Sequence, residues 1–337
     1  TRIGSSAASD VYKRQAFGLP MLQKIDTSSR TTQGLVIAPT RELCIQISKE
    51  LVKYASAIKG LNIVPIYGGA SINDQAKAVK KGAQVLVATP GRMQDMMRRK
   101  YIDISSIAFC ILDEADEMLS QGFKEQVYNI FQYLNKDVQV CLYSATLPTD
   151  ILTLSTKFMR DPVKILVKTE QLTLEGISQY YIALENDQEK YITLKDIYPT
   201  IAVSQCIIYC NSVKRVKDLN DAMKLDGFPV VCIHSGMDKS ERADAYASFK
   251  RGHNRVLISS NVTARGIDIQ QVRTVINFDI PKDVNIYLHR IGRSGRWGRK
   301  GIGINFVTRR DVKYMRSIEA HYSTEIKELP QNFVFDI

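Results

Sequence analysis

Short apolar runs alternate with amphipathic stretches along the chain, and most apolar runs stop at a polar cluster. A run that is apolar on both faces is typical of a strand buried on both sides of a parallel sheet, while the intervening stretches have helical spacing. This alternation predicts a doubly wound, mainly parallel α/β sheet, which binds ligands at the carboxyl ends of its strands. The strands expected in the first half are Leu35–Pro39, Asn62–Tyr67, Val85–Ala88, Phe109–Leu112 and Val138–Tyr143.

The second half repeats this plan after a break. Residues Lys168–Gly176 are polar and end in glycine, so we expect a linker there, between a domain at 16–167 and another at 177–337. Strands are expected at Gln179–Leu184, Cys206–Cys210, Val230–His234, Val256–Ser259, Thr274–Phe278 and Gly303–Val307. Helices are expected at Lys190–Tyr198, Lys214–Leu225, Ser240–Phe249, Val284–Ile291 and Asp311–His321.

Residues Thr1–Gln15 do not share the pattern. They have no initiator Met, and residues 4–9 are small and polar with no periodic apolar face. We expect this stretch to be a non-native or unrelated leader, and the fold then starts with a short helix at Ala16–Leu22, although Pro20 disfavours a helix there.

One run carries three carboxylates within four positions at the end of a predicted strand, namely Asp113, Glu114 and Asp116. A carboxylate at that position can hold Mg²⁺, and a neighbouring one can orient or deprotonate an attacking water. The alternative is a strand that runs into an acidic helix start, which the helix dipole favours at Asp116 and Glu117. Taken alone, the run leaves the two interpretations equally supported.

A second cluster, from His289 to Arg296, repeats arginine every three residues with glycines between. Glycine lets a backbone approach a ligand closely, and the forked guanidinium groups of Arg293 and Arg296 can reach one phosphate. An arginine aimed at a transferred phosphoryl group stabilises its transition state. The alternative, an exposed basic helix end, leaves the helix-weakening glycines unexplained. After the strand expected at Val256–Ser259, Gly266 and Asp268 can serve a ribose or phosphate, but their short pattern is equally that of an ordinary loop.

Three further polar clusters follow predicted strands. Each presents backbone N–H groups, a hydroxyl or an arginine, and such groups contact phosphates. None is an aromatic stacking platform, so together they predict a protein that binds the nucleic-acid backbone with little recognition of the bases. Each cluster alone is more typical of an ordinary turn. The clusters are Pro39-Thr40-Arg41, Gly68-Gly69 and Thr89-Pro90-Gly91-Arg92.

The charge of the chain agrees with a polyanionic partner. The formal charge is +11, with 21 Lys and Arg against 15 Asp and Glu in residues 1–166, and 25 against 20 in residues 167–337. A basic excess in both halves favours nucleic acid first and an anionic membrane second, although charge alone is also compatible with a basic protein that has no such partner. No apolar run reaches the roughly 18 residues that a transmembrane helix needs, and no signal-peptide pattern opens the chain.

The six cysteines form no C-x-x-C pair, and most lie in apolar runs. We therefore expect buried, reduced thiols in a cytoplasmic or nuclear protein. Cys206 and Cys210 share one strand face, but no histidine or second cysteine pair completes a zinc site.

Together, these motifs resemble those of the DEAD-box ATP-dependent RNA helicases. The resemblance covers the chain from about Ala16 to its end and implies two tandem RecA-like domains, ATP and Mg²⁺ as cofactors, and RNA as partner. It is carried by Asp113-Glu114-Ala115-Asp116, Ser144-Ala145-Thr146, His289–Arg296 and the loops Pro39–Leu43, Gly68-Gly69 and Thr89–Arg92. Residues 165–168, 172–177 and 322–324 are similar to the translation initiation factor 4A branch.

The resemblance implies a role for each residue of the acidic run. Asp113 would hold the Mg²⁺ of ATP through water, and Glu114 would position the hydrolytic water as general base. Asp116 would bond towards Ser144 and Thr146, which would tie hydrolysis to RNA binding.

The resemblance also implies roles in the second domain. Arg293 and Arg296 would be the arginine fingers, His289 would bridge the cleft, and Gly266 and Asp268 would face the nucleotide. RNA would be met by Pro39, Thr40, Arg41, Gly69, Thr89, Pro90, Gly91 and Arg92, and in the second domain by Asn211, Ser212, Arg242 and Ser260.

The chain departs from the family's pattern at its start. The family has a glycine-rich phosphate loop ending in Lys-Thr before the helix at Ala16, and an adenine-reading motif upstream. Here Lys13 falls at the place of the loop lysine, but no glycine precedes it closely and no Ser or Thr follows it. We interpret Lys13 as a coincidence and the chain as lacking this region, so it should bind ATP poorly.

Smaller departures concern the second domain. Ser260-Asn261 stands where Thr-Asp is usual, Lys239 where Gln is usual, and Trp297 where Phe or Tyr is usual. Serine keeps the hydroxyl, whereas Asn261 loses a charge and puts an RNA or inter-domain contact in doubt.

The sequence therefore predicts a monomeric, ATP-dependent RNA helicase that couples ATP hydrolysis to RNA clamping and local duplex unwinding, with initiation-factor or other scaffold proteins as candidate partners. An ATP-independent RNA-binding scaffold is the alternative, because the phosphate loop is absent. A DNA translocase shares the two-domain plan, and competition between RNA and DNA would separate it from an RNA enzyme.

Overall fold

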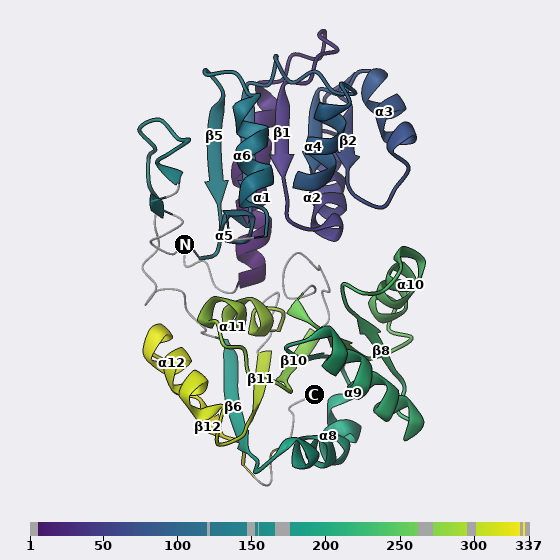
Figure 1. Cartoon of the computed structure of the whole chain (residues 1–337), viewed down its shortest axis with the longest axis vertical. Helices are drawn as coiled ribbons and strands as arrows, with labels where there is room; N and C mark the ends of the chain where they lie inside the picture. Colours follow the sequence, from purple (N-terminus) through teal and green to yellow (C-terminus); the bar gives the residue numbers. More distant parts are fainter. Residues whose placement is uncertain are drawn as a thin grey trace. The chain divides into compact units, whose positions relative to one another are not determined.

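The computed structural model describes residues 6–119, 122–146, 152–153, 155–165, 176–261, 272–294, 301–330 and 333, without the side chains of residues 6–11 and 239. Contacts divide the chain into two compact units, which we call the first unit (residues 10–165) and the second unit (residues 166–337, with which residues 1–9 are grouped). In Figure 1 the first unit runs from purple to teal and the second from teal to yellow.

The first unit is built around a parallel sheet. Among the described residues its strands lie in the order β2-β3-β1-β4-β5, and each neighbouring pair is parallel. The strands are β1 (Gly34–Ile37), β2 (Ile63–Ile66), β3 (Val85–Ala88), β4 (Phe109–Asp113) and β5 (Gln139–Tyr143). The helices are α1 (Ser6–Gln23), α2 (Arg41–Tyr54), α3 (Ile72–Lys80), α4 (Pro90–Arg98), α5 (Ala115–Leu119) and α6 (Lys124–Gln132).

Alternate side chains of these strands enter two separate cores. Leu35 and Ile37 of β1 pack into a core that includes residues of α3, α4, α5 and α6, whereas Val36 packs against α1 and α2. Successive side chains of a strand point to opposite faces, so a strand that is apolar at every position must be covered on both sides. Figure 1 shows α4 and α6 in front of the sheet and α1 and α2 behind it.

The second unit repeats this architecture. Its strands lie in the order β12-β6-β11-β10-β7-β9-β8, again with parallel pairs. They are β6 (Ile177–Ala183), β7 (Gln205–Tyr209), β8 (Val230–Ile233), β9 (Val256–Ser259), β10 (Val272–Asn277), β11 (Gly301–Val307) and β12 (Lys327–Glu328). The helices are α8 (Asp187–Ile201), α9 (Val213–Leu225), α10 (Lys239–Lys250), α11 (Val284–Ile291) and α12 (Val312–Tyr322).

Helices of the second unit also cover both faces of its sheet. Ile207 and Tyr209 of β7 pack into a core with side chains of α10, α11 and α12, whereas Cys206 and Ile208 pack into a core with α8 and α9. The predicted α/β class with two mainly parallel sheets is therefore confirmed. The cysteines are free and buried or partly buried, and burial raises the pKa of Cys44 and Cys210 to about 12.

The element boundaries differ in a few places from those expected. The strands Val85–Ala88 and Val256–Ser259 and the helix Val284–Ile291 are as predicted, but β12 has no signal in the pattern because it is only two residues long. The first helix was predicted too short: α1 begins at Ser6 and includes Pro20 near its end. Its earlier part is held by an ion pair of 2.7 Å between Arg14 and Glu50 of α2.

The proposed domain limits remain a prediction. Of the expected linker, only Gly176 belongs to the described residues, where it has φ +95°. Within the described part of the chain, no helix combines the length and apolar character needed to cross a bilayer.

Candidate functional site

The three carboxylates predicted at the end of β4 lie at the carboxyl edge of the first sheet, and all three are buried. Asp113 is the last residue of β4 and pairs in register with Tyr143 at the end of β5. Asp113 is 1% exposed, Glu114 4% and Asp116 7%. Carboxylates are rarely buried this completely unless hydrogen bonds or a ligand compensate their lost hydration. This group is therefore a candidate ligand-binding or catalytic site.

Glu114 lies in a strained backbone conformation. Its φ is +54°, the left-handed region that non-glycine residues seldom adopt, at a cost of about 1–3 kcal/mol. Its backbone N–H donates to Asp113 Oδ1 at 3.1 Å. Among the described residues, its buried Oε2 has no hydrogen-bond partner. A strained residue that presents an unsatisfied carboxylate oxygen is suited to accept a proton or hold a water.

Lys13, interpreted from the sequence as a coincidence, lies beside these carboxylates. Its Nζ is 3.3 Å from Glu114 Oε1 and 3.9 Å from Asp113 Oδ1. The residues between Ser5 and Gln15 include no glycine, and Arg14 follows Lys13, so the position provides an ammonium group without the backbone cradle and hydroxyl of a phosphate loop. The sequence could not signal this contact, because it depends on α1 extending ahead of Ala16.

Asp116 makes the two side-chain contacts that the resemblance implied. Its Oδ1 accepts from Ser144 Oγ at 2.8 Å, and its Oδ2 accepts from Thr146 Oγ1 at 2.6 Å. The backbone N–H of Thr146 also donates to Ser144 Oγ at 3.3 Å. Asp116 therefore connects the start of α5 to the segment that follows β5. A displacement of one segment would break these hydrogen bonds or move the other segment with it.

The donor set around Asp113 fits a magnesium ion. Mg²⁺ prefers hard oxygen ligands and usually keeps several waters, with one or two protein carboxylates. Asp113 supplies a buried carboxylate at the strand end, and Oε2 of Glu114, which has no partner in the described part of the chain, supplies an acceptor for water next to it. The buried carboxylates thus suit both a metal and the water that a metal would help to orient.

The three loops expected to contact RNA lie together at the same edge of the first sheet. Ile37, Ala88 and Ile66 are in register across the adjacent strands β1, β3 and β2, and each loop starts directly after one of them. The Arg41 guanidinium lies over the Tyr67 ring, 5.1 Å from its centroid, and links two of the loops. In the strand order these loops follow β2, β3 and β1, and the carboxylates follow β4, which is the next strand beside β1.

Within these loops, some of the groups expected to contact RNA form hydrogen bonds inside the protein. The Thr40 hydroxyl caps α2 by accepting from Leu43 N at 3.3 Å. Arg92 Nη1 donates to Gln75 Oε1 at 2.7 Å and to the carbonyl of Ala70 at 3.1 Å, so this arginine holds the Gly68–Ala70 turn. Gly69, which follows β2, has φ +94°.

The start of α4 is more open to a ligand. Pro90 occupies its first turn, and within the described helix the Thr89 side chain makes no capping hydrogen bond. A Cβ added at Gly91 would meet no atom of the described residues within 4 Å. Free N–H groups and a favourable dipole make such a helix start suitable for a phosphate.

In the second unit, the described RNA-contact candidates occupy ends of adjacent strands. Asn211 and Ser212 follow β7, and Ser260 follows β9, which pairs with β7. Ser212 caps α9 by accepting from Arg215 N at 3.2 Å, and Arg242 lies in α10. All four residues are thus at strand ends or on the helix after β8.

The arginine cluster contains a buried residue whose role the sequence did not reveal. Arg290 is 0% exposed and donates to Asn261, Asn277 and Asn211 and to the carbonyl of Asp279, at 2.6–3.1 Å. Burial lowers its pKa to about 10. Because its acceptors come from the ends of β7, β9 and β10, Arg290 holds three loops together, and its residue type alone could not distinguish this from phosphate binding.

The other members of the cluster are only partly described. His289 and Arg293 are each 4% exposed, and Arg293 Nε donates to the His289 carbonyl at 3.3 Å. Arg296, Gly266 and Asp268 lie outside the described residues. Their expected roles therefore remain predictions.

His234, which follows β8, gives the second unit a pH-dependent stability. Its Nδ1 accepts from Gly236 N at 3.1 Å, and burial, followed by the positive charge of Lys217, lowers its pKa below 6.5. The unfolded chain binds the proton more readily in the window just below pH 6.5, so His234 makes stability rise with pH there. His234→Asn keeps an acceptor for Gly236 and should flatten this rise, as measured by urea unfolding at several pH values. An unchanged slope would contradict the assignment.

The chain has clear relatives among known proteins. It matches the family "DEAD/DEAH box helicase" over residues 13–154 and "Helicase conserved C-terminal domain" over residues 189–298. It is 48% identical to ATP-dependent RNA helicase eIF4A of Pyricularia oryzae and 47% identical to that of Kluyveromyces lactis, in each case over 97% of this chain and 83% of the relative.

Solved structures agree with these matches. S. cerevisiae Dbp5 bound to RNA and ADP BeF3 superposes with a TM-score of 0.86 at 31% identity, covering 94% of this chain and 82% of that one. Mss116p bound to ssRNA and AMP-PNP shares the fold, with a TM-score of 0.83 at 24% identity, covering 95% of this chain and 69% of that one.

Proposed function

Because the chain belongs to the DEAD/DEAH box helicase family, we propose that it is an ATP-dependent RNA helicase of the eIF4A type, which couples ATP hydrolysis to RNA clamping and local duplex separation. The observation that carries this proposal is the buried Asp113, Glu114 and Asp116 group, with Asp116 bonded to Ser144 and Thr146. A helix cap alone does not require three buried carboxylates, one of them strained.

The chemistry assigned to the first unit is hydrolysis of ATP. Asp113 would hold Mg²⁺, which supplies charge neutralisation at the phosphates when bound. Glu114 orients the attacking water and accepts its proton, since its carboxylate has one oxygen without a partner among the described residues. Asp116 passes movement of the Ser144–Thr146 segment to α5, so RNA binding and hydrolysis become coupled. Arg293 and Arg296 would stabilise the transferred charge.

RNA binding is assigned to the loops at the ends of β1, β2 and β3, and to the Asn211–Ser212 and Ser260 loops of the second unit. The open start of α4 is the strongest support, because its N–H groups suit a backbone phosphate. Backbone contacts of this kind give affinity with little sequence preference. The proposed protein acts as a monomer, works in the cytoplasm or nucleus, and has initiation-factor or other scaffold proteins as partners.

A charge introduced at Gly91 tests the RNA assignment. Gly91→Asp should raise the Kd for single-stranded RNA by about tenfold, because the carboxylate repels phosphate at the start of α4. The fold should tolerate it, since the added atoms meet open space and the helix start favours an acidic residue. Fluorescence anisotropy with labelled RNA measures the change.

Gly122→Asp is the matched control, because Gly122 also has open space around its Cβ position but lies between α5 and α6. It should leave the RNA affinity unchanged. Equal weakening by both variants would show a general effect of charge and contradict the placement of RNA at α4.

ATP turnover with RNA and DNA tests the proposed function as a whole. The assay needs a chimera in which residues 1–15 are replaced by the N-terminal segment of the Pyricularia oryzae relative, because these residues provide no glycine-rich phosphate loop. We expect single-stranded RNA to stimulate hydrolysis, and DNA of the same sequence to compete poorly. RNA binding without any stimulated hydrolysis would instead favour an ATP-independent scaffold.

A further inference from the structure

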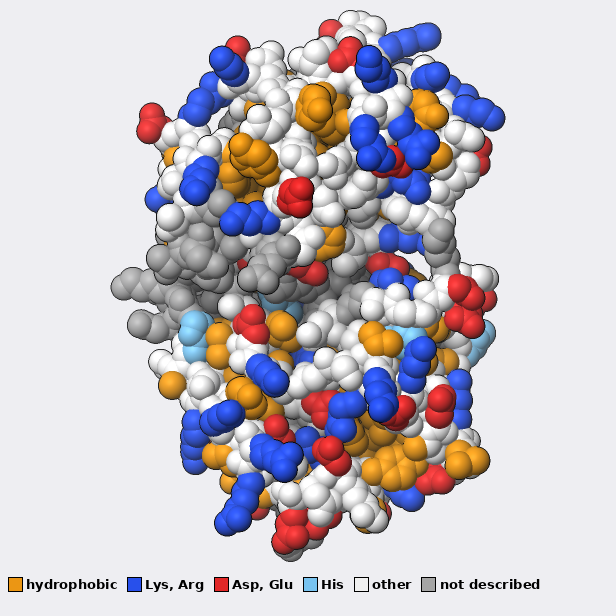
Figure 2. Space-filling model, in the orientation of Figure 1, with side chains coloured by type: hydrophobic (Ala, Val, Ile, Leu, Met, Phe, Trp, Pro, Cys, Tyr) orange, Lys and Arg blue, Asp and Glu red, His pale blue; other side chains and the backbone are white. Residues whose placement is uncertain are grey.

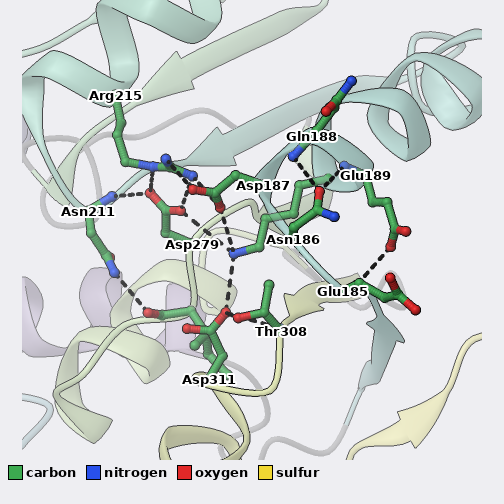
Figure 3. A network of polar contacts seen from close by, with 12 residues as sticks. Glu185, Asn186, Asp187, Gln188, Glu189, Asn211, Arg215, Asp279, Thr308 and Asp311 are labelled. Carbon is green, nitrogen blue, oxygen red and sulfur yellow. Dashed lines mark hydrogen bonds and ion pairs between the residues drawn. The ribbon is translucent and has the colours of Figure 1, made fainter.

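A continuous polar network lies at the carboxyl edge of the second sheet. Its members follow four strands that are adjacent in the order β6-β11-β10-β7. Asp187 opens α8 after β6, Asp311 and Thr308 follow β11, Asp279 follows β10, and Asn211 follows β7. Figure 3 shows the side chains of Asp187, Asp279 and Asp311 converging from these separate segments.

Lys190 of α8 provides the central cation of this network. It is 3% exposed, although lysine is almost never buried without partners. Its Nζ lies 3.2 Å from Asp311 Oδ2, 3.8 Å from Asp279 Oδ1 and 3.9 Å from Asp187 Oδ1. One ammonium group therefore attracts carboxylates from three different strand ends.

Asp279 connects Lys190 to the Asn211–Ser212 loop, which is predicted to contact RNA. Its Oδ2 accepts from the backbone N–H of Asn211 at 3.0 Å and from Arg215 Nε at 2.7 Å. The Asn211 side chain also donates to the carbonyl of Ile280 at 2.9 Å. Arg215 Nη2 also lies 2.7 Å from Asp279 Oδ1, so the carboxylate that fixes the backbone at Asn211 is held by two cations, Arg215 and the buried Lys190.

Asn211 connects this network to the buried arginine of α11. Asn211 Oδ1 accepts from Arg290 Nη2 at 2.8 Å, and Asn261 after β9 accepts from the same guanidinium. The contacts of Lys190 and Arg290 therefore join the ends of five neighbouring strands. Buried ion pairs seldom add more stability than a packed apolar core would, so their placement at the ligand edge calls for another explanation.

We propose that Lys190 is a positioning residue for RNA: through Asp279, it fixes the Asn211–Ser212 loop in the conformation that meets the RNA backbone. This inference rests on the proposed function. Lys190 itself does not contact the RNA. Its substitution therefore loosens the ligand edge and weakens RNA binding without removing a contact group.

Lys190→Met tests the proposal in the full chain, with two measurements. Methionine keeps the length of the side chain but not its charge, so Asp279 and Asp311 lose their shared cation. Hydrogen exchange of residues 209–216 should speed up by about tenfold, and the Kd for labelled single-stranded RNA should rise by about tenfold at a temperature well below the unfolding midpoint.

Lys195→Met is the matched control. Lys195 lies in the same helix and forms an equally close ion pair, 3.0 Å from Asp226, but that partner lies just beyond the end of α9. Exchange of residues 209–216 and the RNA affinity should both stay unchanged in this variant. Asp279→Asn serves as a second test should Lys190→Met fail to fold, because asparagine keeps an acceptor for Asn211 and should produce the same two effects more weakly.

The two measurements separate this inference from the proposed function. Unchanged exchange at residues 209–216 in Lys190→Met and Asp279→Asn would overturn the inference, whether or not RNA binds. Faster exchange with an unchanged RNA affinity would overturn it as well. Faster exchange in a chain whose unsubstituted form does not bind RNA would contradict the RNA part of the inference and the proposed function together.

Discussion

Glu114→Gln should lower RNA-stimulated ATP turnover by roughly 10²–10⁴-fold, the usual contribution of a general base. Glutamine has the shape of glutamate, so the buried site and the φ of +54° can be kept, but its amide cannot accept the proton of the attacking water. RNA binding in the presence of ATP should be retained. Phosphate release from the chimera with the relative's N-terminal segment measures turnover, and anisotropy measures RNA binding.

Glu117→Gln, which makes the same change three residues later in α5, is the control for this prediction. It should keep turnover close to that of the unsubstituted chimera. A Glu114→Gln variant with unchanged turnover would remove Glu114 from the proposed chemistry. Equal losses in the two variants would indicate that the charge of the region matters, and not a proton transfer at Glu114.

Arg290→Met should destabilise the second unit by about 3–5 kcal/mol, because a hydrogen bond from a charged donor contributes about 1.5–3 kcal/mol and Arg290 makes two such bonds to buried acceptors. The change leaves the buried side-chain oxygen of Asn277 and the buried carbonyl of Asp279 without this donor, and it also removes the partner of Asn211 and Asn261, which are exposed residues. A buried acceptor left unsatisfied carries its own desolvation cost, whereas the exposed asparagines can bind water instead. Urea unfolding followed by circular dichroism measures the loss as a lower midpoint.

Arg316→Met is the comparison for Arg290→Met. Arg316 also forms an ion pair, 2.8 Å from Glu319 in α12, but its side chain is 71% exposed. Surface pairs contribute little, so this variant should change stability by about 0.5 kcal/mol or less. Similar effects of the two substitutions would show that Arg290 is not the connection between strand ends that its contacts indicate.

The sheets could be predicted from the sequence because their strands are buried on both faces. Runs such as Val85–Ala88 and Val256–Ser259 are apolar at every position, and the structure gives them the same bounds. The short β12 has no such signature, since Lys327–Glu328 is polar and exposed. The extension of α1 to Ser6 was also unpredictable, because it depends on tertiary contacts such as Arg14 with Glu50.

The candidate site was predictable where it depends on strand ends, and unpredictable where it depends on three-dimensional partners. The carboxylates after β4 and the hydroxyls after β5 could be expected to meet, because parallel neighbours end at one edge. The left-handed conformation of Glu114 leaves no trace in the sequence. The structural role of Arg290 is equally invisible in the sequence. It differs from Arg293 because its hydrogen-bond acceptors lie on three separate loops.

Asn261 shows how a structure can change the interpretation of a departure from a family pattern. The loss of a charge at this position put an RNA or inter-domain contact in doubt. In the structure, Asn261 Oδ1 accepts from Arg290 Nε at 2.9 Å and also from Nη2. The contact with Arg290 requires a side-chain oxygen as acceptor, and asparagine provides one as aspartate would.

Separation of a short RNA duplex with a single-stranded overhang tests the central claim most directly. The chimera should displace the labelled strand when ATP and Mg²⁺ are present, and should fail to do so without ATP or with Glu114→Gln under multiple turnover. DNA of the same sequence should be a poor substrate. Strand displacement that is equal with and without ATP, or ATP hydrolysis that is stimulated by RNA but never accompanied by displacement, would contradict the account of this chain as an ATP-dependent RNA helicase.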